Sequence, residues 1–166
     1  MTTMDDLKAA FAGESQANRR YLAFAEKAEE EGLPNIARLF RAVAAAETVH
    51  AHSHFRTMGG VKSTAENLKT AIAGENYEVK TMYPEFMENA KEAGERRAEI
   101  TFKHAWEVEK IHEQLYRAAL EQVERGDIEA AEYYVCSVCG HTHVGAEPPE
   151  RCPICGAKRE RYMKIE

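Results

Sequence analysis

This 166-residue chain has no cysteine before Cys136, and nowhere does it have a long apolar run. A membrane-spanning helix needs about 18 or more consecutive apolar residues, and no stretch approaches that length. The N-terminal residues Met1–Asp6 are acidic and lack the apolar segment of a secretion signal. We therefore expect a soluble, cytoplasmic protein that has no membrane partner.

The chain also lacks the excess of basic residues that nucleic-acid binding requires. Its net charge is −6, with 22 Lys and Arg against 28 Asp and Glu, whereas nucleic acids are bound by clustered Lys and Arg. No Gly-x-Gly-x-x-Gly turn is present, so the sequence indicates neither a nicotinamide nor a flavin site. Nucleic acid is thus not an expected partner, and electrons for any redox chemistry would come from another protein.

What the chain does contain is an internal repeat. Each half contains a glutamate preceded by Ala-Gly and, later, a Glu-x-x-His motif. The distance in sequence between the two copies is one position longer for Glu-x-x-His than for the first glutamate. The repeated residues are Glu14, Glu47 and His50 in the first half and Glu75, Glu109 and His112 in the second. We infer that an ancestral helix pair was duplicated together with these side chains.

Apolar residues recur at helical spacing over most of the chain, and Gly and Pro mark the interruptions. The pattern predicts four long helices, over residues 3–31, 34–59, 63–93 and 95–125. Thr3 with Asp6 is expected to cap the first helix, and Ser63 with Glu66 the third. Pro84 is expected to kink the third helix.

All four cysteines lie near the C-terminal end of the sequence, as two Cys-x-x-Cys pairs: Cys136, Cys139, Cys152 and Cys155. In a cytosolic setting, such pairs indicate a tetrahedral thiolate metal site rather than disulfides, and the spacing leaves both iron and zinc open. So short a segment needs the metal in order to fold. Because the cysteines complete the tetrahedron, His141 and His143 are expected in exposed turns.

The predicted fold class is therefore mainly α. Residues 1–130 are expected to form a four-helix bundle, and residues 131–166 a small metal-bound unit of β-hairpin knuckles. In the bundle, residues three apart on a helix point to one side, so each Glu-x-x-His presents two ligands together. One Glu from each of two helices, with Glu-x-x-His from each of the other two, is the ligand set of ferritin-like di-iron and di-manganese bundles.

Glu78, one turn after Glu75, would add a fifth carboxylate to this centre. At about 4 Å and an effective dielectric of about 20, each like-charged pair costs about 4 kcal/mol. Two divalent cations are therefore expected, and hard carboxylate oxygens with imidazole suit iron or manganese. Gly13 and Gly74 predict a close approach of neighbouring chain, because a mid-helix glycine costs ~1 kcal/mol relative to alanine.

Two tyrosines are further candidates. Tyr21 lies two turns after Glu14, and Tyr83 follows Glu78 closely, so both could approach the metals, with core packing as the equal alternative. The remaining aromatic and histidine residues of the repeat region are expected in the core (Phe40, Phe102 and Trp106) or outside the ligand set (His52, His54 and His104).

Together these motifs resemble the rubrerythrin family over essentially the whole chain. The matching segments are Ala12–Ser15, Ala46–His50, Gly74–Glu78 with Met82–Pro84, Glu109–His112, Tyr134–Cys136 and Cys152–Gly156. The resemblance implies a ferritin-like bundle with a non-haem di-iron centre, followed by a rubredoxin-like domain with an Fe(Cys)4 site. It also implies that hydrogen peroxide is the substrate and is reduced to water.

The resemblance further implies roles for the ligands: Glu47 and Glu109 bridge the irons, Glu14 binds one iron, and Glu75 with His112 binds the other. Glu78 and His50 would be alternative ligands of the first iron, exchanging as its oxidation state changes. With Tyr21 and Tyr83, they are the candidate catalytic residues.

Electrons would enter one at a time through the cysteine site from an external donor protein such as a reductase or a rubredoxin. The resemblance implies a homodimer in which the rubredoxin-like domain of one subunit serves the di-iron centre of the other. Two alternative functions remain: an iron-oxidising, detoxifying ferritin-like protein, and a non-enzymatic bundle with a zinc-ribbon binding module. The first needs no built-in electron entry, and the second would contain zinc and be colourless.

Overall fold

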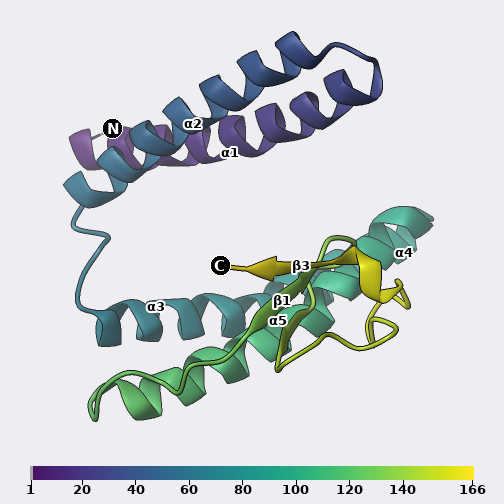
Figure 1. Cartoon of the computed structure of the whole chain (residues 1–166). Coiled ribbons are helices and arrows are strands. Elements are labelled where there is room, and N and C mark those ends of the chain that lie inside the picture. The colour runs from purple at the N-terminus through teal and green to yellow at the C-terminus, as the bar shows by residue number, and fades with distance from the viewer. Residues whose placement is uncertain (1) are drawn as a thin grey trace. The chain divides into compact units, whose positions relative to one another are not determined.

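The computed structural model describes residues 2–166, which form two units (Figure 1). The first unit ends at Lys62, and the second runs from Ser63 to Glu166. Within residues 2–166, none of the helices combines the length and the apolar character that crossing a membrane requires. The predicted mainly α fold class, with a small β element near the C-terminus, is confirmed.

The first unit is a hairpin of two long helices, α1 (Thr3–Glu30) and α2 (Pro34–Thr57). After α1, Gly32 has a φ of 74°, a left-handed conformation that costs glycine little because it has no Cβ. Pro34 then opens α2, where its missing N–H removes no helical hydrogen bond. The two helices therefore reverse direction within a few residues.

Small side chains let α1 and α2 pack closely. The buried core consists of Ala25, Ala28 and Ala37, and Phe40 packs against it. By contrast, Val49 on α2 is 66% exposed. The hairpin thus carries apolar surface that its own two helices do not cover.

The cap of α1 lies one residue earlier than predicted. Thr2, not Thr3, is the capping residue, and its partner is Asp5, not Asp6. The Asp5 N–H donates to Thr2 Oγ1 at 3.3 Å, and the Thr2 N–H donates to the Asp5 carboxylate at 2.8 Å. Thr2 and Thr3 each have an aspartate three positions on, and the helix extends far enough to include Thr3 in its first turn.

In the second unit, α3 (Thr64–Tyr77), a π-helical turn η1 (Glu78–Met82) and α4 (Tyr83–Glu92) follow one another without a break and pack against α5 (Arg96–Val123). The π turn lies just before Pro84, at which a kink was predicted, and the kink itself stays a prediction. Pro84 itself lies in the first turn of α4, where a missing N–H is tolerated.

A three-stranded antiparallel sheet follows α5, with β1 (Tyr133–Cys136) between β2 (Thr142–Val144) and β3 (Tyr162–Ile165). A 3-10 turn, η2 (Arg159–Arg161), leads into β3. Strand β2 contacts α5. The sheet therefore places the cysteine loops beside the helix that carries Glu109 and His112.

The capping box predicted at the start of α3 is confirmed: the Glu66 N–H donates to Ser63 Oγ at 3.4 Å, and the Ser63 N–H donates to the Glu66 carboxylate at 3.3 Å. Ser63→Ala is expected to lower the free energy of unfolding by about 1 kcal/mol, because an N-terminal amide of α3 loses its acceptor. Ser53→Ala, on the exposed surface of α2, should change it by less than about 0.5 kcal/mol. Urea denaturation followed by circular dichroism measures both, and equal effects would contradict the capping role.

Candidate metal centres

The first unit brings together three of the repeated residues. Ligand atoms of Glu14 on α1 and of Glu47 and His50 on α2 all lie within 4.8 Å of one another. His50 Nδ1 lies 2.9 Å from Glu47 Oε2, and the side chains of His50 and Glu47 are 56% and 15% exposed. Two carboxylates and an imidazole thus form one half of the predicted ligand set.

Asn18 fixes α1 against α2 beside this half-site. Its Nδ2 donates to the backbone oxygen of Ala44 at 2.7 Å and to Thr48 Oγ1 at 2.8 Å. These two acceptors flank Glu47 in the sequence of α2. The hydrogen bonds therefore set the register in which Glu14 and Glu47 face each other.

The second unit repeats the arrangement with Glu75 on α3 and with Glu109 and His112 on α5, again within 4.8 Å. His112 Nδ1 lies 2.6 Å from Glu109 Oε2, and this hydrogen bond raises the pKa of His112. Burial, reinforced by the charge of Glu109 and a hydrogen bond with it, raises the pKa of Glu75 to about 7. Without a cation, this half-site holds a proton close to neutral pH.

Glu78 and Tyr83 lie beside the second half-site. Glu78 is outside the group of three, but burial and the charge of Glu109 raise its pKa. Burial and the charges of Glu78, Glu109 and Glu75 raise the pKa of Tyr83. The Tyr83 phenol is thus a proton-bearing group next to the carboxylates.

Two aromatic residues that the sequence singled out, Tyr21 and Trp106, have different surroundings in the structure. Tyr21 packs against Phe24 and Phe40, with ring centroids 6.3 Å apart in both cases. Trp106, predicted as a core residue, is only part-buried and makes a polar contact: its Nε1–H donates to the backbone oxygen of Val79 at 2.8 Å. The ammonium of Lys110 lies over its ring, 3.1 Å from the centroid.

The two half-sites offer oxygen and imidazole donors, which suit divalent iron or manganese. Carboxylates that share a partly buried site are stable as anions only when cations compensate their charge. Burial and the charge of Glu109 accordingly raise the pKa of Glu75. The donors present therefore fit a pair of hard divalent ions.

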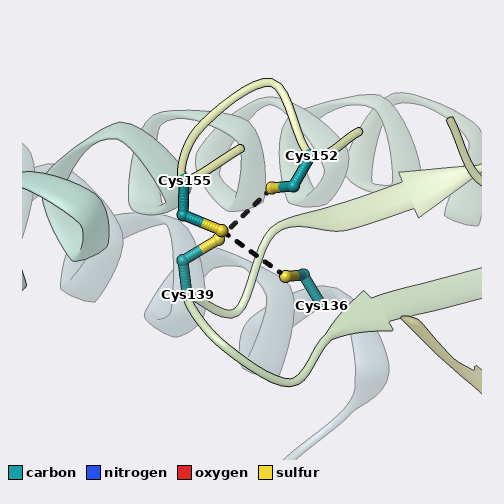
Figure 2. Close-up of side chains that lie close together, drawn as sticks. All are labelled: Cys136, Cys139, Cys152 and Cys155. Carbon is teal, nitrogen blue, oxygen red and sulfur yellow. Dashed lines mark hydrogen bonds between the residues drawn. The ribbon is translucent and has the colours of Figure 1, made fainter. Parts of the chain in front are cut away.

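The four cysteines converge from two loops, with their sulfur atoms turned toward one another (Figure 2). Cys136 Sγ lies 3.8 Å from Cys155 Sγ, and Cys139 Sγ lies 3.5 Å from Cys152 Sγ. A tetrahedral ion with bonds of about 2.3 Å separates its sulfur ligands by about 3.8 Å, whereas a disulfide joins sulfurs about 2.05 Å apart. The geometry is that of a tetrahedral thiolate metal site.

Two polar side chains support the thiolates. Burial opposes ionisation of Cys152, but the Tyr162 hydroxyl and the backbone N–H groups of Cys155 and Ile154 more than offset it and lower the pKa of Cys152 to about 6. The Tyr162 hydroxyl also lies 2.7 Å from His141 Nδ1. His141 was predicted in an exposed turn and is instead buried, at 7% exposure, because it packs beneath this tyrosine.

The cysteine unit contacts a residue of the second half-site. Thr142 Oγ1 on β2 lies 2.9 Å from His112 Nε2 and donates to the backbone oxygen of Gly140 at 3.3 Å. Because the hydroxyl proton goes to Gly140, its oxygen accepts the Nε2 proton of His112. His112 Nδ1 then donates to the Glu109 carboxylate when it is protonated, and offers its lone pair on the same side when a metal displaces that proton.

This contact lies within one chain, and service to the di-iron centre of a second subunit, which the resemblance implied, stays a prediction. Sequence reasoning did not single out Thr142. No signal in the sequence pointed to it, because the contact depends on how the small sheet lies against α5.

Comparison with known proteins identifies the family. The family model for rubrerythrin matches residues 5–120, and that for the rubrerythrin rubredoxin-like domain matches residues 134–163. Rubrerythrin-2 of Clostridium acetobutylicum is 41% identical over 97% of this chain and 95% of its own, and nigerythrin of Nitratidesulfovibrio vulgaris is 35% identical over 97% and 85%. The structure of nigerythrin in its fully reduced, all-ferrous state is similar, with a TM-score of 0.58, 34% identity and coverage of 99% and 87%.

The chain belongs to the rubrerythrin family.

Membership confirms the ferritin-like and rubredoxin-like parts of the predicted fold. It also confirms the expected cofactors, a di-iron site of Glu and His residues and a four-cysteine site. The named relatives indicate an oxidoreductase. The domain boundary after residue 130 and the role of each ligand stay predictions.

The remaining predictions concern two glycines and three histidines. An added Cβ at Gly13 or Gly74 would meet no atom within 4 Å, so the predicted close packing is not seen at either glycine. Within residues 2–166, the groups that could hold a metal include none of His52, His54 and His104. This agrees with their lack of repeat partners.

Metal binding by the second half-site should release a proton, because iron and manganese bind the carboxylate anion and Glu75 has a pKa of about 7 in the metal-free protein. Below that pH, the affinity for Mn²⁺ is expected to fall by about tenfold per pH unit for each proton displaced. Isothermal calorimetry in buffers of different ionisation enthalpy measures the proton count.

Glu75→Gln should bind more weakly and release fewer protons, since it removes the titrating carboxyl. Glu124→Gln, on an exposed position outside both half-sites, should behave like the unaltered protein. Equal proton release by Glu75→Gln and the unaltered protein would contradict this origin of the pH dependence.

Proposed function

We propose that this rubrerythrin-family protein is a peroxidase that reduces hydrogen peroxide to water, with electrons from an external donor protein entering through the four-cysteine site. The observation that carries the proposal is the contact between that domain and the bundle: Thr142 Oγ1 lies 2.9 Å from His112 Nε2. A protein that only oxidises or stores iron has no need of an electron entry beside its metal ligands.

The residues that each unit brings together would hold the irons: Glu14 would bind one iron, Glu75 with His112 the other, and Glu47 and Glu109 would be shared by both. His50 and Glu78 are proposed as alternative ligands of the first iron. Two features support an exchange. The His50 side chain is 56% exposed and therefore has room to move, and Glu78 stands at the start of a π turn, a local irregularity common at functional sites.

The reaction consumes two electrons and two protons for each peroxide, breaks the O–O bond and yields two waters. Two ferrous ions, when bound, supply the two electrons. The chain supplies the protonated group nearest the carboxylates: burial and the charge of Glu78 raise the pKa of the Tyr83 phenol, so it stays protonated at neutral pH. We propose that Tyr83 donates a hydrogen bond into the site and that Tyr21 takes the corresponding place in the first half.

The proposal includes a homodimer in the cytoplasm. The exposed apolar surface of α2, with Val49 66% exposed, supports an association between chains. Thiolate metal sites without disulfides are typical of a reducing compartment. The donor is a reductase or a rubredoxin-type protein.

Peroxide consumption by the iron-loaded protein with a rubredoxin-type donor tests the function. The proposal expects one peroxide consumed for every two donor electrons. An iron-oxidising protein would instead consume added Fe²⁺ and accumulate ferric mineral, and this outcome without donor-linked peroxide reduction would refute the proposal.

Cys139→Ser is expected to abolish donor-driven turnover, while a chemically reduced bundle centre still consumes one equivalent of peroxide. The reason is that the cysteine sulfurs and the carboxylate clusters are separate groups of ligands. Stopped-flow absorbance measures both, and Ser137→Ala, in the same loop, is the control because it keeps every thiolate. Loss of single-turnover consumption in Cys139→Ser would show that the two sites do not have separate roles.

Thr142→Val keeps the side-chain shape but removes the hydroxyl that links Gly140 to His112. It is expected to slow electron transfer from the reduced cysteine site to the oxidised bundle centre by about 10- to 100-fold, the usual cost of losing a hydrogen bond to a metal-binding histidine. Thr142→Ser should restore most of the rate. A rate for Thr142→Val equal to that of the unaltered protein would exclude the contact as part of the route.

A further inference from the structure

The two halves of the repeat differ in length by one residue, and the difference lies inside a helix. Seven positions separate Glu14 from Tyr21, but eight positions separate Glu75 from Tyr83. The second half therefore has one more residue between its glutamate and its tyrosine. The π turn η1 (Glu78–Met82) lies in this interval, whereas α1 is a regular α-helix throughout.

The extra residue does not change where the tyrosine lies. Each tyrosine belongs to an aromatic triad, made of Tyr21, Phe24 and Phe40 in the first half and Tyr83, Phe86 and Phe102 in the second. The tyrosine and the phenylalanine of the next helix have ring centroids 6.3 Å and 6.4 Å apart, and the two phenylalanines 5.6 Å and 5.5 Å. An inserted residue rotates an α-helix by about 100°, so the matching triads require the π turn to absorb it.

The π turn that accommodates the extra residue leaves the backbone carbonyl of Val79 without a donor from its own helix. The Tyr83 N–H, which would serve Val79 in an α-helix, donates to the oxygen of Glu78. The following residue, Pro84, has no N–H to offer. The oxygen of Val79 instead accepts the indole N–H of Trp106, at 2.8 Å.

In the first half, a hydrogen bond links the two equivalent positions, but the donor and the acceptor are exchanged between the helices. Counted along the repeat from the aligned glutamates, Asn18 corresponds to Val79 and Ala44 corresponds to Trp106. Asn18 donates its Nδ2 to the oxygen of Ala44, so there the donor is on the first helix of the pair, and that helix is regular. In the second half the donor is on the second helix, and it coincides with the opened turn.

We propose that Trp106 is a positioning residue that holds the inserted residue in the π turn and thereby keeps Glu78 and Tyr83 together on the face of Glu75. The inference rests on the proposed role of Glu78, the carboxylate whose equivalent in the first half is Ala17. Pro84 contributes by leaving Val79 no alternative donor. Relaxation of the turn to an α-helix would rotate Glu78 and Tyr83 apart by about 100°.

The first test uses the full-length, metal-free protein and no activity. Trp106 is the single tryptophan, so its indole N–H gives one NMR signal, which should exchange slowly with solvent. Trp106→Phe keeps an aromatic ring but removes the donor, and the amides of residues 79–83 should then exchange about tenfold faster. Unchanged exchange in Trp106→Phe would overturn the proposal.

Two further variants separate the hydrogen bond from packing. Pro84→Ala gives residue 84 an N–H five positions after Val79, so adding it to Trp106→Phe should restore slow exchange. Failure of this rescue would show that only packing was lost. Lys110→Gln removes the cation over the ring and should leave exchange in the π turn unchanged; faster exchange there would contradict the role of the indole N–H.

The second test is a double-mutant cycle on peroxide turnover by the iron-loaded protein. Trp106→Phe should slow turnover in the unaltered background and have little further effect beside Glu78→Ala, because both act through Glu78. Additive effects would overturn the assignment. If the unaltered iron-loaded protein does not reduce peroxide, the proposed function fails, and the exchange measurements still decide whether Trp106 holds the turn.

Discussion

The second half-site depends on the carboxylate of Glu109, which attracts His112 and repels the neighbouring acids Glu75 and Glu78. This carboxylate accepts a hydrogen bond from His112 Nδ1 at 2.6 Å, and its charge adds to burial in raising the pKa of Glu75 and of Glu78. The packing of α3 against α5 holds the backbones that carry these acids close together. A cation removes the repulsion without moving the backbone, so the metal-free half-site is under electrostatic strain that metal binding relieves.

Most of this arrangement could be predicted from the sequence because helix geometry converts spacing into direction. Glu47 and His50 are three residues apart, and an α-helix allows them to meet in only one way. Because the Glu-x-x-His pattern occurs in both halves at matching positions, a chance occurrence is implausible. The Thr142 contact and the burial of His141 could not be predicted, since both depend on how the small sheet packs and not on any local period.

The π turn could be predicted in part. The distance between the two copies of the repeat is one position longer at the tyrosine than at the first glutamate, and this difference is visible in the sequence. Pro84 suggested a kink, which is the usual consequence of proline within a helix. The longer repeat distance carries more information than the proline, since it shows that a residue was added inside the helix and limits where it lies. Only the matching aromatic triads show that the helix absorbed the residue without turning its later part.

The two duplicated halves also differ in the number of carboxylates that they carry. Identical half-sites would bind both metals alike, which suits storage better than a reaction in which one metal changes its ligands. Glu78 stands where the first half has Ala17 and adds a carboxylate beside the second half-site, while the π turn that begins at Glu78 lets Tyr83 keep the position that Tyr21 has in the first half. An unpaired carbonyl inside a protein costs about 1–3 kcal/mol, so a donor for the partly buried Val79 oxygen stabilises the insertion. The indole of Trp106 supplies that donor from α5, three residues before Glu109, and thereby joins the helix irregularity to the element that carries the ligands.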